Sequence, residues 1–370
     1  MGKYKFNTLF QFLTKSKIKA GEGKSEGKYP FYTSSQEVNK YIDKMQHNTE
    51  ALVFGTGGMA SIHYVDSAFS TSTDCFVVTQ KKDDFFTKYI YYFFIANFHI
   101  LQNGFKGAGL KHISKKYIED IEIPVIDKNE QKNIIKKLDK AQELIDLRKE
   151  SIAKLDELAK SIFINMFGDP VSNPKGWEVR ELDDVCEITS SKRVYKSDYV
   201  SEGIPFYKIK EIILKSKNIE PKEIEYISID AFENFASKFG YPHEGDILVT
   251  AVGATIGYFY LVDDEKFYFK DGNLIWLRNY KMDINKKFLL YMFRTKEFKN
   301  KILELSKGAA QNALTIVKLK SVFICTPPID LQNKFTSIIE KIEEQKSLYE
   351  KELEKLEENF QALLQQSFKE

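Results

Sequence analysis

Two stretches of the sequence carry residue types that suit contacts with a phosphate backbone and with base edges. In the first 40 residues lysines alternate with glycines, and a run rich in hydroxyl and amide groups follows; a similar composition returns near residue 190. Lys and Arg neutralise phosphates, while hydroxyl, amide and guanidinium groups form hydrogen bonds with base edges. The candidates are Lys15, Lys17, Lys19, Lys24, Tyr32, Ser34, Ser35 and Gln36, then Ser190, Ser191, Lys192, Arg193, Tyr195, Lys196, Lys208 and Lys210.

A pair of equivalent loops provides a second candidate surface. The loop 106–112 returns at 307–313, and the two copies contribute Lys106, Lys111, Lys307, Gln311 and Asn312. The same residue types are typical of solvated surface loops, and either loop could be a turn that closes a domain. The residues alone therefore leave nucleic-acid binding and an ordinary protein surface as open alternatives.

Signatures of catalysis and of metal binding are weak. An adenine methylase motif needs an acid or amide before its prolines and an aromatic residue after them, whereas Pro327-Pro328 is flanked by Thr326 and Ile329. The run from Gly55 to Gly58 lacks the Lys-Ser/Thr of a phosphate-binding loop, and the five histidines lie far apart. We expect no catalytic residue and no metal site on this chain.

Composition indicates a globular protein of two domains. The chain has 370 residues, 43% of them hydrophobic, and a net charge of +2, with the excess of lysine concentrated in residues 1–125. Three scattered cysteines, Cys75, Cys186 and Cys325, favour a reducing, cytoplasmic setting, and we expect no signal peptide. The apolar run Tyr89–Ile100 is too short to span a bilayer and predicts a core helix within about 84–98.

The elements that position these residues occur twice. Residues 106–167 and 307–368 are the same segment 201 positions apart, without a gap. Upstream of it the two halves share strand and turn patterns with loops of different length, and Tyr29-Pro30-Phe31-Tyr32 matches Ile204-Pro205-Phe206-Tyr207. A repeat this long is a duplicated domain with its trailing helix, and loops that vary on a fixed frame are where specificity usually resides.

Each half ends in a predicted helix of about 38 residues, over 129–167 and 331–368. Apolar residues recur at three- and four-residue steps on each helix, which is typical of long helices that pair through a narrow stripe. The predicted pairing residues are Ile134, Leu138, Ile145, Ile152, Leu155 and Ile162 with Phe335, Ile339, Ile342, Leu348, Leu353, Leu356, Phe360 and Leu363. The alternative is that each helix packs on its own domain.

The predicted fold class is α+β, with two similar mixed α/β domains separated by two long helices. We expect an antiparallel coiled coil and pseudo-two-fold symmetry, because a helix this long is marginal alone and the two stripes match. The predicted boundaries are 1–125 and 168–328 for the domains, and 126–167 and 329–370 for the helices.

The whole chain resembles the specificity subunit of type I restriction-modification systems. The resemblance rests on the alternation of domains and helices and on three motifs. These are the helix entry at Ile121–Gln131 and again at Val322–Gln332, the helix exit Met166-Phe167-Gly168-Asp169-Pro170, and the run Gly107–Ser114.

The resemblance implies a DNA-recognition subunit without enzyme activity. It implies that each target-recognition domain reads one half of a bipartite double-stranded DNA site. It also implies that the helices set the spacer and dock two adenine methyltransferase subunits, which flip the target base. S-adenosylmethionine, ATP and Mg are expected on partner subunits, restriction subunits among them, and not on this chain. A coiled-coil scaffold that binds only proteins is the alternative function.

Overall fold

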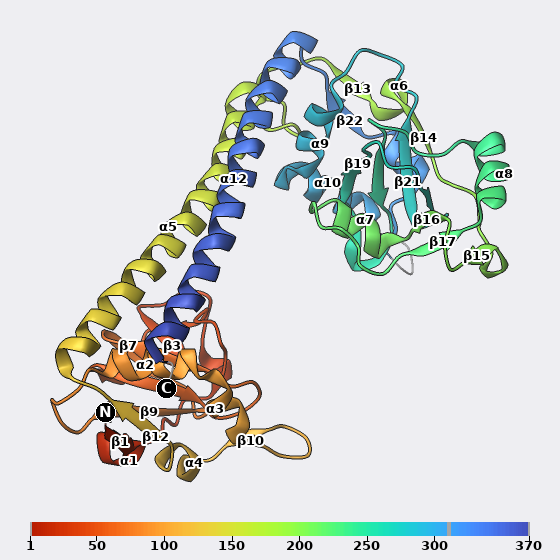
Figure 1. Ribbon diagram of the computed structural model, residues 1–370. Coiled ribbons are helices and arrows are strands. Elements are labelled where there is room, and N and C mark those ends of the chain that lie inside the picture. Colours follow the sequence, from red (N-terminus) through yellow and green to blue (C-terminus); the bar gives the residue numbers. More distant parts are fainter. Residues whose placement is uncertain (1, 309–311, 369–370) are drawn as a thin grey trace. The chain divides into compact units, whose positions relative to one another are not determined.

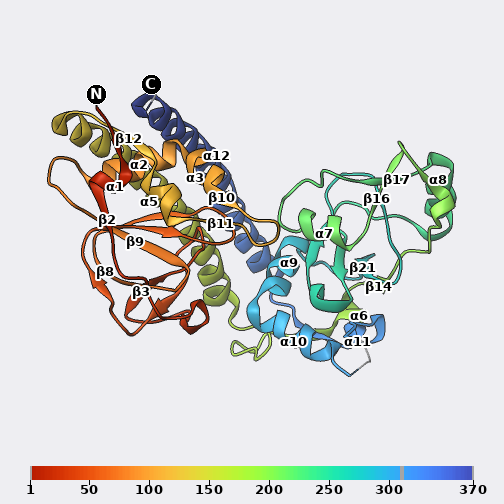
Figure 2. The ribbon, with the colours of Figure 1, turned by 90° about the horizontal axis from the view of Figure 1, so that it is seen from below.

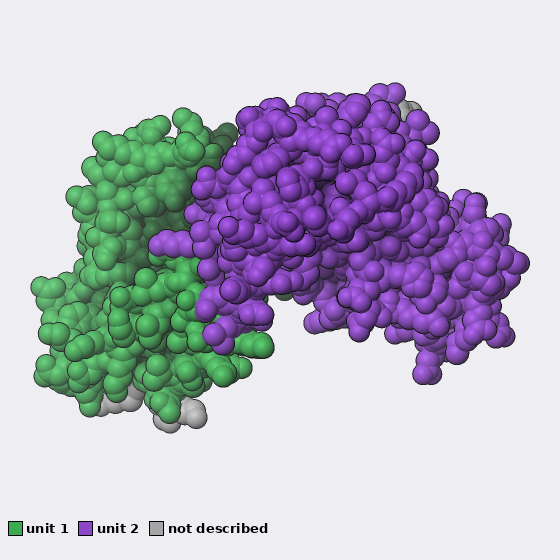
Figure 3. Space-filling model, turned by 90° about the horizontal axis from the view of Figure 1, so that it is seen from above, with its two compact units in different colours: residues 1–151, 349–370 green, residues 152–348 purple. Residues whose placement is uncertain are grey.

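The computed structural model describes residues 2–308 and 312–368 (Figure 1). Gln311, one of the candidate residues, lies outside the described residues. The chain divides into two compact units, which Figure 3 shows in different colours: unit 1 comprises residues 1–151 and 349–370, and unit 2 comprises residues 152–348. Each unit therefore contains one globular domain and parts of both long helices.

Unit 1 is built on two four-stranded sheets. The first has the order β2-β9-β6-β7 and is antiparallel, and the second has the order β4-β3-β8-β5, in which β3 and β8 are parallel. Two antiparallel pairs, β1 with β12 and β10 with β11, complete the strands. The strands are β1 Gly2–Lys5, β2 Phe10–Phe12, β3 Tyr29–Tyr32, β4 Tyr41–Ile42, β5 His47–Asn48, β6 Ala51–Gly55, β7 Ile62–Val65, β8 Ala68–Thr71, β9 Cys75–Gln80, β10 Phe105–Lys106, β11 His112–Ile113 and β12 Glu122–Val125.

Strand β6 lies at the centre of the unit 1 core, buried on both faces. Leu52 and Phe54 pack with the aromatic residues of the following helices, while Ala51 and Val53 face the second sheet. This explains its continuous apolar sequence, since a strand covered on both faces has no solvated side. The helices are α1 Phe6–Leu9, η1 Ala20–Glu22, α2 Thr87–Ala96, α3 Phe98–Gly104 and α4 Lys115–Glu119.

The aromatic helix predicted over about 84–98 corresponds to α2, and a second short helix, α3, follows it. Helix α2 ends at Ala96 because Asn97 leaves the helical region, with φ −117° and ψ 42°, and α3 begins at Phe98. Tyr89, Ile90 and Phe94 are almost completely buried, as expected for a core helix. No helix within the described residues is both long and apolar enough to cross a membrane.

Unit 2 repeats the first of these sheets in the same strand order and shares part of the second. Its antiparallel sheet β14-β21-β18-β19 corresponds to β2-β9-β6-β7, and its second sheet, β15-β17-β16-β20, contains the parallel pair β16 and β20. The strands are β13 Val179–Glu181, β14 Glu187–Thr189, β15 Tyr199–Val200, β16 Ile204–Tyr207, β17 Glu225–Ile227, β18 Ile247–Thr250, β19 Phe259–Leu261, β20 Tyr268–Phe269, β21 Leu274–Arg278 and β22 Phe323–Cys325, which pairs with β13. The helices are α6 Leu182–Val185, η2 Lys196–Asp198, α7 Ile209–Lys215, α8 Ile229–Phe239, η3 Gly253–Thr255, α9 Lys286–Arg294, α10 Lys296–Ser306 and α11 Ile316–Lys320.

One buried glutamine in each half demonstrates the duplication at atomic detail. The Gln131 side chain accepts from the Phe86 N–H at 2.9 Å and donates to the Ile126 carbonyl at 2.8 Å. The Gln332 side chain accepts from the Asn285 N–H at 2.9 Å and donates to the Pro327 carbonyl at 2.7 Å. Each amide therefore joins the start of a long helix to the segment that precedes α2 or α9.

The two long helices are α5 Lys128–Phe167 and α12 Ile329–Phe368, and they run antiparallel within each unit. In unit 1 the guanidinium of Arg148 pairs with Glu352 at 2.8 Å and lies 4.0 Å from the ring centre of Tyr349. In unit 2 Lys346 pairs with Asp156 at 2.7 Å, and the Phe163 and Phe335 rings are 5.5 Å apart.

Most of the predicted pairing residues lie in or against these packed clusters. Leu138, Ile145, Phe335, Ile339 and Phe360 are buried. Residues partly buried against the clusters are Ile134, Ile162, Ile342, Leu353, Leu356 and Leu363, and Ile152 and Leu155 are half-buried.

Leu348 was predicted to lie on the stripe but does not, since its side chain is 51% exposed. Leu364 and Phe163, absent from the prediction, are almost completely buried instead. A helix of 3.6 residues per turn drifts against a strict seven-residue pattern, so the contacting positions shift along its length.

Candidate nucleic-acid interface

In unit 1 the candidate loops meet at one edge of the domain. Backbone hydrogen bonds connect Thr73 to Ile18, Ser72 to Tyr32 and Thr56 to Asp74, each at 2.8 Å. The Gly58 N–H donates to the Lys111 carbonyl at 3.0 Å. Segments distant in sequence therefore form one surface, which we call the unit 1 loop edge: residues 13–19, 33–37, 56–61, 72–74 and 106–112.

Unit 2 forms the corresponding edge with equivalents of three of these bonds. The backbone N–H groups of Lys270, Ala251 and Gly253 donate to the carbonyls of Tyr207 at 2.9 Å, Asn273 at 2.9 Å and Asn312 at 3.2 Å, respectively. The unit 2 loop edge comprises residues 190–193, 251–257, 270–273 and 312–313. Gly58 and Gly253 occupy equivalent places and both have positive φ, +80° and +66°, which explains why glycine stands at these two turns.

Both loop edges carry more basic than acidic side chains. The unit 1 loop edge holds Lys15, Lys17, Lys19, Lys106 and Lys111 against two acidic residues, Glu37 and Asp74. The unit 2 loop edge holds Lys192, Arg193 and Lys270 against Asp271. The five lysines in unit 1 are exposed, so their ammonium groups can reach an anionic polymer.

Some candidate hydroxyls are used inside the domains. Ser34 donates to the Asp74 carbonyl at 2.7 Å and accepts from the Thr56 and Gly57 N–H groups at 3.2 and 3.3 Å. A hydroxyl has one donor and two acceptor positions, so Ser34 has no capacity left for a base. Ser190 and Ser191 donate to the Leu274 and Phe269 carbonyls, each at 2.7 Å, and keep only an acceptor role.

Other unit 1 candidates also have structural contacts. Tyr32 is buried against Phe69, and burial raises the pKa of its phenol. Gln36 donates to the Ala60 carbonyl at 3.0 Å and so fixes one loop against the next. The Ser35 carbonyl accepts from the His63 ring at 2.9 Å, and burial lowers the pKa of that histidine, which leaves it uncharged at pH 7. Lys24 pairs with Asp43 at 3.8 Å, away from the loop edge.

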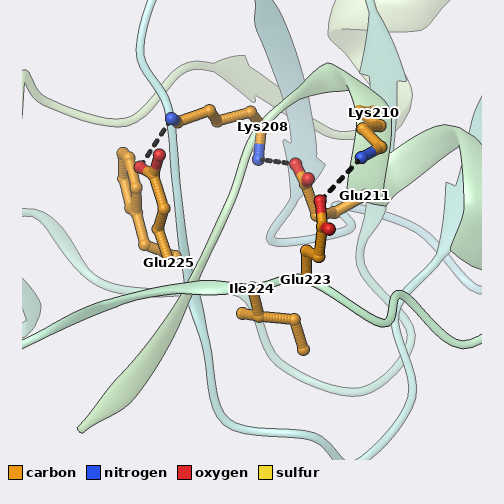
Figure 4. A pocket seen from close by; sticks show the side chains of 7 residues that line it. Lys208, Lys210, Glu211, Glu223, Ile224 and Glu225 are labelled. Carbon is orange, nitrogen blue, oxygen red and sulfur yellow. Dashed lines mark hydrogen bonds and ion pairs between the residues drawn. The ribbon is translucent and has the colours of Figure 1, made fainter. Parts of the chain in front are cut away.

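Lys208 and Lys210 line a pocket that is not suited to a phosphate (Figure 4). Lys208 Nζ lies 2.5 Å from Glu225 Oε2, and Lys210 Nζ lies 3.7 Å from Glu223 Oε2. With Glu211, three carboxylates face two ammonium groups in a hollow of about 210 Å³. The predicted phosphate contacts at these two lysines are therefore disfavoured, because an anion would meet a net negative charge.

The basic run after β14 remains accessible. Arg193 is 70% exposed and pairs loosely with Asp271 at 3.5 Å, and Lys192 lies 5.4 Å from the Phe239 ring centre. Tyr195 is 64% exposed, and Lys196 is exposed in η2. Asn312, within the unit 2 loop edge, and Lys307, outside it, are also exposed.

The run from Gly55 to Gly58, whose sequence favours a tight turn after a strand over a phosphate-binding loop, lies largely in the turn 56–61 of the loop edge, a place that the sequence pattern does not predict. The signal that could have placed it is the glycine shared by the two halves at Gly58 and Gly253. Among the described residues, no group of three or more His, Cys, Asp or Glu is placed to hold a metal ion.

The fold defines a class of protein in which one mixed α/β domain occurs twice, each copy followed by a long helix that pairs with its counterpart. The sequence matches the type I restriction modification DNA specificity domain over residues 1–157 and again over residues 174–358. The chain therefore belongs to this family.

Named relatives and solved structures agree with this membership. A type I restriction enzyme specificity subunit of Haemophilus influenzae is 27% identical over 345 residues, covering 86% of this chain and 80% of that protein. The type I restriction enzyme MjaVIII specificity subunit of Methanocaldococcus jannaschii is 24% identical over 365 residues, covering 90% and 83%. The fold is similar to that of the type I restriction-modification S subunit from M. genitalium, with a TM-score of 0.61, 17% identity and coverage of 100% and 96%.

Proposed function

We propose that this chain is the DNA-recognition subunit of a type I restriction-modification complex and that each loop edge reads one half of a bipartite double-stranded site. The observation that carries this proposal is that one basic edge is built twice, with three equivalent backbone hydrogen bonds, from loops that differ in sequence. A shared frame with different loops is what two readers of different half-sites require.

The helices would supply the second part of this function. In the proposal α5 and α12 together set the spacer between the half-sites and dock two adenine methyltransferase subunits, with restriction subunits as further partners. Two recognition domains that each bind DNA weakly bind together more tightly when a stiff helix pair holds them at the distance between the two half-sites, because binding of one raises the effective concentration of the other. S-adenosylmethionine, ATP and Mg would be bound by the partner subunits, catalysis would reside there, and the complex would work in the cytoplasm.

Mapping of methylated adenines in the host genome tests the bipartite site. The expected result is one motif of two short specified halves around a fixed unspecified spacer, which disappears when the gene for this chain is deleted. A methylation pattern unchanged by the deletion would contradict the proposal.

A salt titration distinguishes the proposal from a scaffold that binds only proteins. Affinity of the reconstituted complex for a duplex carrying that motif should fall steeply between about 50 and 200 mM salt, because phosphate contacts release counterions. A scaffold would assemble with its partner subunits but show no preference for the motif over a scrambled duplex.

A further inference from the structure

Two neighbouring turns of the unit 1 loop edge carry strongly exposed apolar side chains. Met59 is 70% exposed and Leu110 is 69% exposed, the highest values among the large apolar residues described in unit 1. The Gly58 N–H donates to the Lys111 carbonyl, and Gly57 forms a β-bridge with His112, so the two turns are joined next to these side chains. Backbone bonds therefore fix the two turns relative to one another.

Two lysines lie on the same β-hairpin as Leu110. Lys106 and Lys111 are exposed, and within the described part of the chain neither has an ion-pair partner. Lys106 lies opposite His112 in the two-stranded ribbon of β10 and β11, whose connecting loop holds Leu110 and projects from the domain (Figures 1 and 2). A ligand that covers the tip formed by Met59 and Leu110 would meet exposed apolar side chains close in the fold to two lysines without ion-pair partners in the described part of the chain.

We infer that Met59 and Leu110 contact the C5 methyl group of thymine in the half-site read by unit 1, with Lys106 and Lys111 on the neighbouring phosphates. The major groove admits a two-stranded β-ribbon, and the thymine methyl is the apolar group that base edges present there. This inference rests on the proposed function and names the base that one loop edge reads.

The corresponding positions in unit 2 differ in chemistry. The residue that follows Gly253 is Ala254, where unit 1 has Met59 after Gly58. The sequence counterpart of Leu110 is Gln311, which lies outside the described residues. The inferred contact of Met59 and Leu110 with thymine therefore belongs to unit 1, and the equivalent positions of unit 2 are not expected to make it.

Deoxyuridine provides the test, because it differs from thymidine only by the missing methyl group. The full chain, assembled with its methyltransferase subunits, first selects its duplex from a random library. Each thymidine of both half-sites is then replaced by deoxyuridine, one position at a time. Binding should weaken by about fourfold at one or more positions in one half only, which is the effect of one buried methyl group. Met59→Ser with Leu110→Ser should bind thymine and uracil duplexes equally.

Val171→Ser is the matched control, since Val171 is 42% exposed in the turn after α5 and lies outside both loop edges. This variant should keep the preference for thymine. The inference is overturned if the unmodified complex binds every uracil duplex as tightly as the thymine duplex, or if the double variant still prefers thymine. In both cases the selection of a specific duplex would still support the proposed function. If the double variant keeps normal DNA affinity but assembles poorly with its partner subunits, the tip contacts a protein partner, and the thymine inference is also overturned. Failure to select any duplex would instead reject the proposed function.

Discussion

At the scale of single residues, accessible charge separates the candidates for DNA contact from those that hold the loops. Lys192 and Arg193 extend from the unit 2 loop edge, whereas Ser34 is fully used in hydrogen bonds within its own domain. Side chains of the first kind can be removed without leaving a buried polar group unpaired, and those of the second kind cannot.

Lys192→Ala with Arg193→Ala should weaken DNA binding by the assembled complex and reduce its dependence on salt, because up to two phosphate contacts are lost. Electrophoretic mobility shifts at several salt concentrations measure both effects. Lys208→Ala is the matched control, since Lys208 is paired with Glu225 and should contribute little. Unchanged affinity in the double variant would make the run after β14 an ordinary surface.

Glu187 provides a prediction on pH. Its carboxylate accepts from Arg278 at 2.9 Å and from Asn279 at 2.7 Å, and these bonds, led by that of Arg278, lower its pKa. Because the pKa of Glu187 is lower in the folded state, its ionised carboxylate stabilises the fold at pH values above the pKa of the unfolded state, about 4.3. This stabilisation is lost as the pH falls through the pKa of the folded state.

Glu187→Gln should therefore lower the free energy of unfolding by about 0.5–1 kcal/mol at pH 7, a small value because the pair is partly exposed. The difference from wild type should shrink as the pH falls from about 5 to 3. Urea unfolding at each pH is the measurement. A difference independent of pH would show that the charge of Glu187 does not stabilise the fold.

At the scale of elements, the long helices depend on their shared apolar contacts. In unit 1 Leu138, Ile145, Phe360 and Leu364 form a buried cluster, and Leu356 packs against it. A single helix of this length has little stability alone, so these contacts hold the pair together.

Leu356→Lys should loosen the helix pair and impair assembly with the methylating partner, because the variant places a charge against an apolar cluster. We expect a cost of about 2–4 kcal/mol in unfolding free energy. Leu348→Lys is the matched control on the same helix, since Leu348 is exposed and should tolerate the change. Co-purification with the methyltransferase subunit distinguishes the two, and equal recovery of both variants would contradict the assigned seam.

At the scale of the whole molecule, the proposed function makes the helix pair a determinant of spacer length. The residue pairs Asp156–Lys346 and Arg148–Glu352 define the antiparallel register within the two units. Removal of residues 150–156 together with 345–351 takes opposed segments of equal length from both helices and keeps the remaining contacts in register.

That double deletion shortens the pair by about 10 Å, at 1.5 Å per residue. We expect the methylated motif to lose about three base pairs of spacer, at 3.4 Å per pair, or modification to fail because the half-sites are turned out of phase. Sequencing of methylated DNA from cells with the variant gives the answer. Deletion of residues 150–156 alone is the comparison. It should disrupt the pairing of α5 with α12, because it shortens only one of the two helices. A modified motif with an unchanged spacer would remove the helices from this role.

The sequence by itself determined the duplication, the two long helices and the type of fold. These features are encoded locally: the repeat in the order of residues, the helices in the three- and four-residue apolar pattern, and the buried strands in short apolar runs. The same apolar pattern predicted the helix that is α2 but not the separate helix α3 after it, because a break at Asn97 depends on how its neighbours pack.

Only the tertiary structure decided which candidate residues share a surface. Lysines from residues 15–19 and 106–111 meet at one edge because hydrogen bonds join turns far apart in sequence, which composition does not encode. It also showed that Ser34, Lys208 and Lys210 are occupied by partners, and that Met59 and Leu110 are exposed on two turns that backbone hydrogen bonds join. Hydrogen-bond partners and solvent exposure depend on contacts between residues far apart in the sequence, so they cannot be predicted from residue types along the chain.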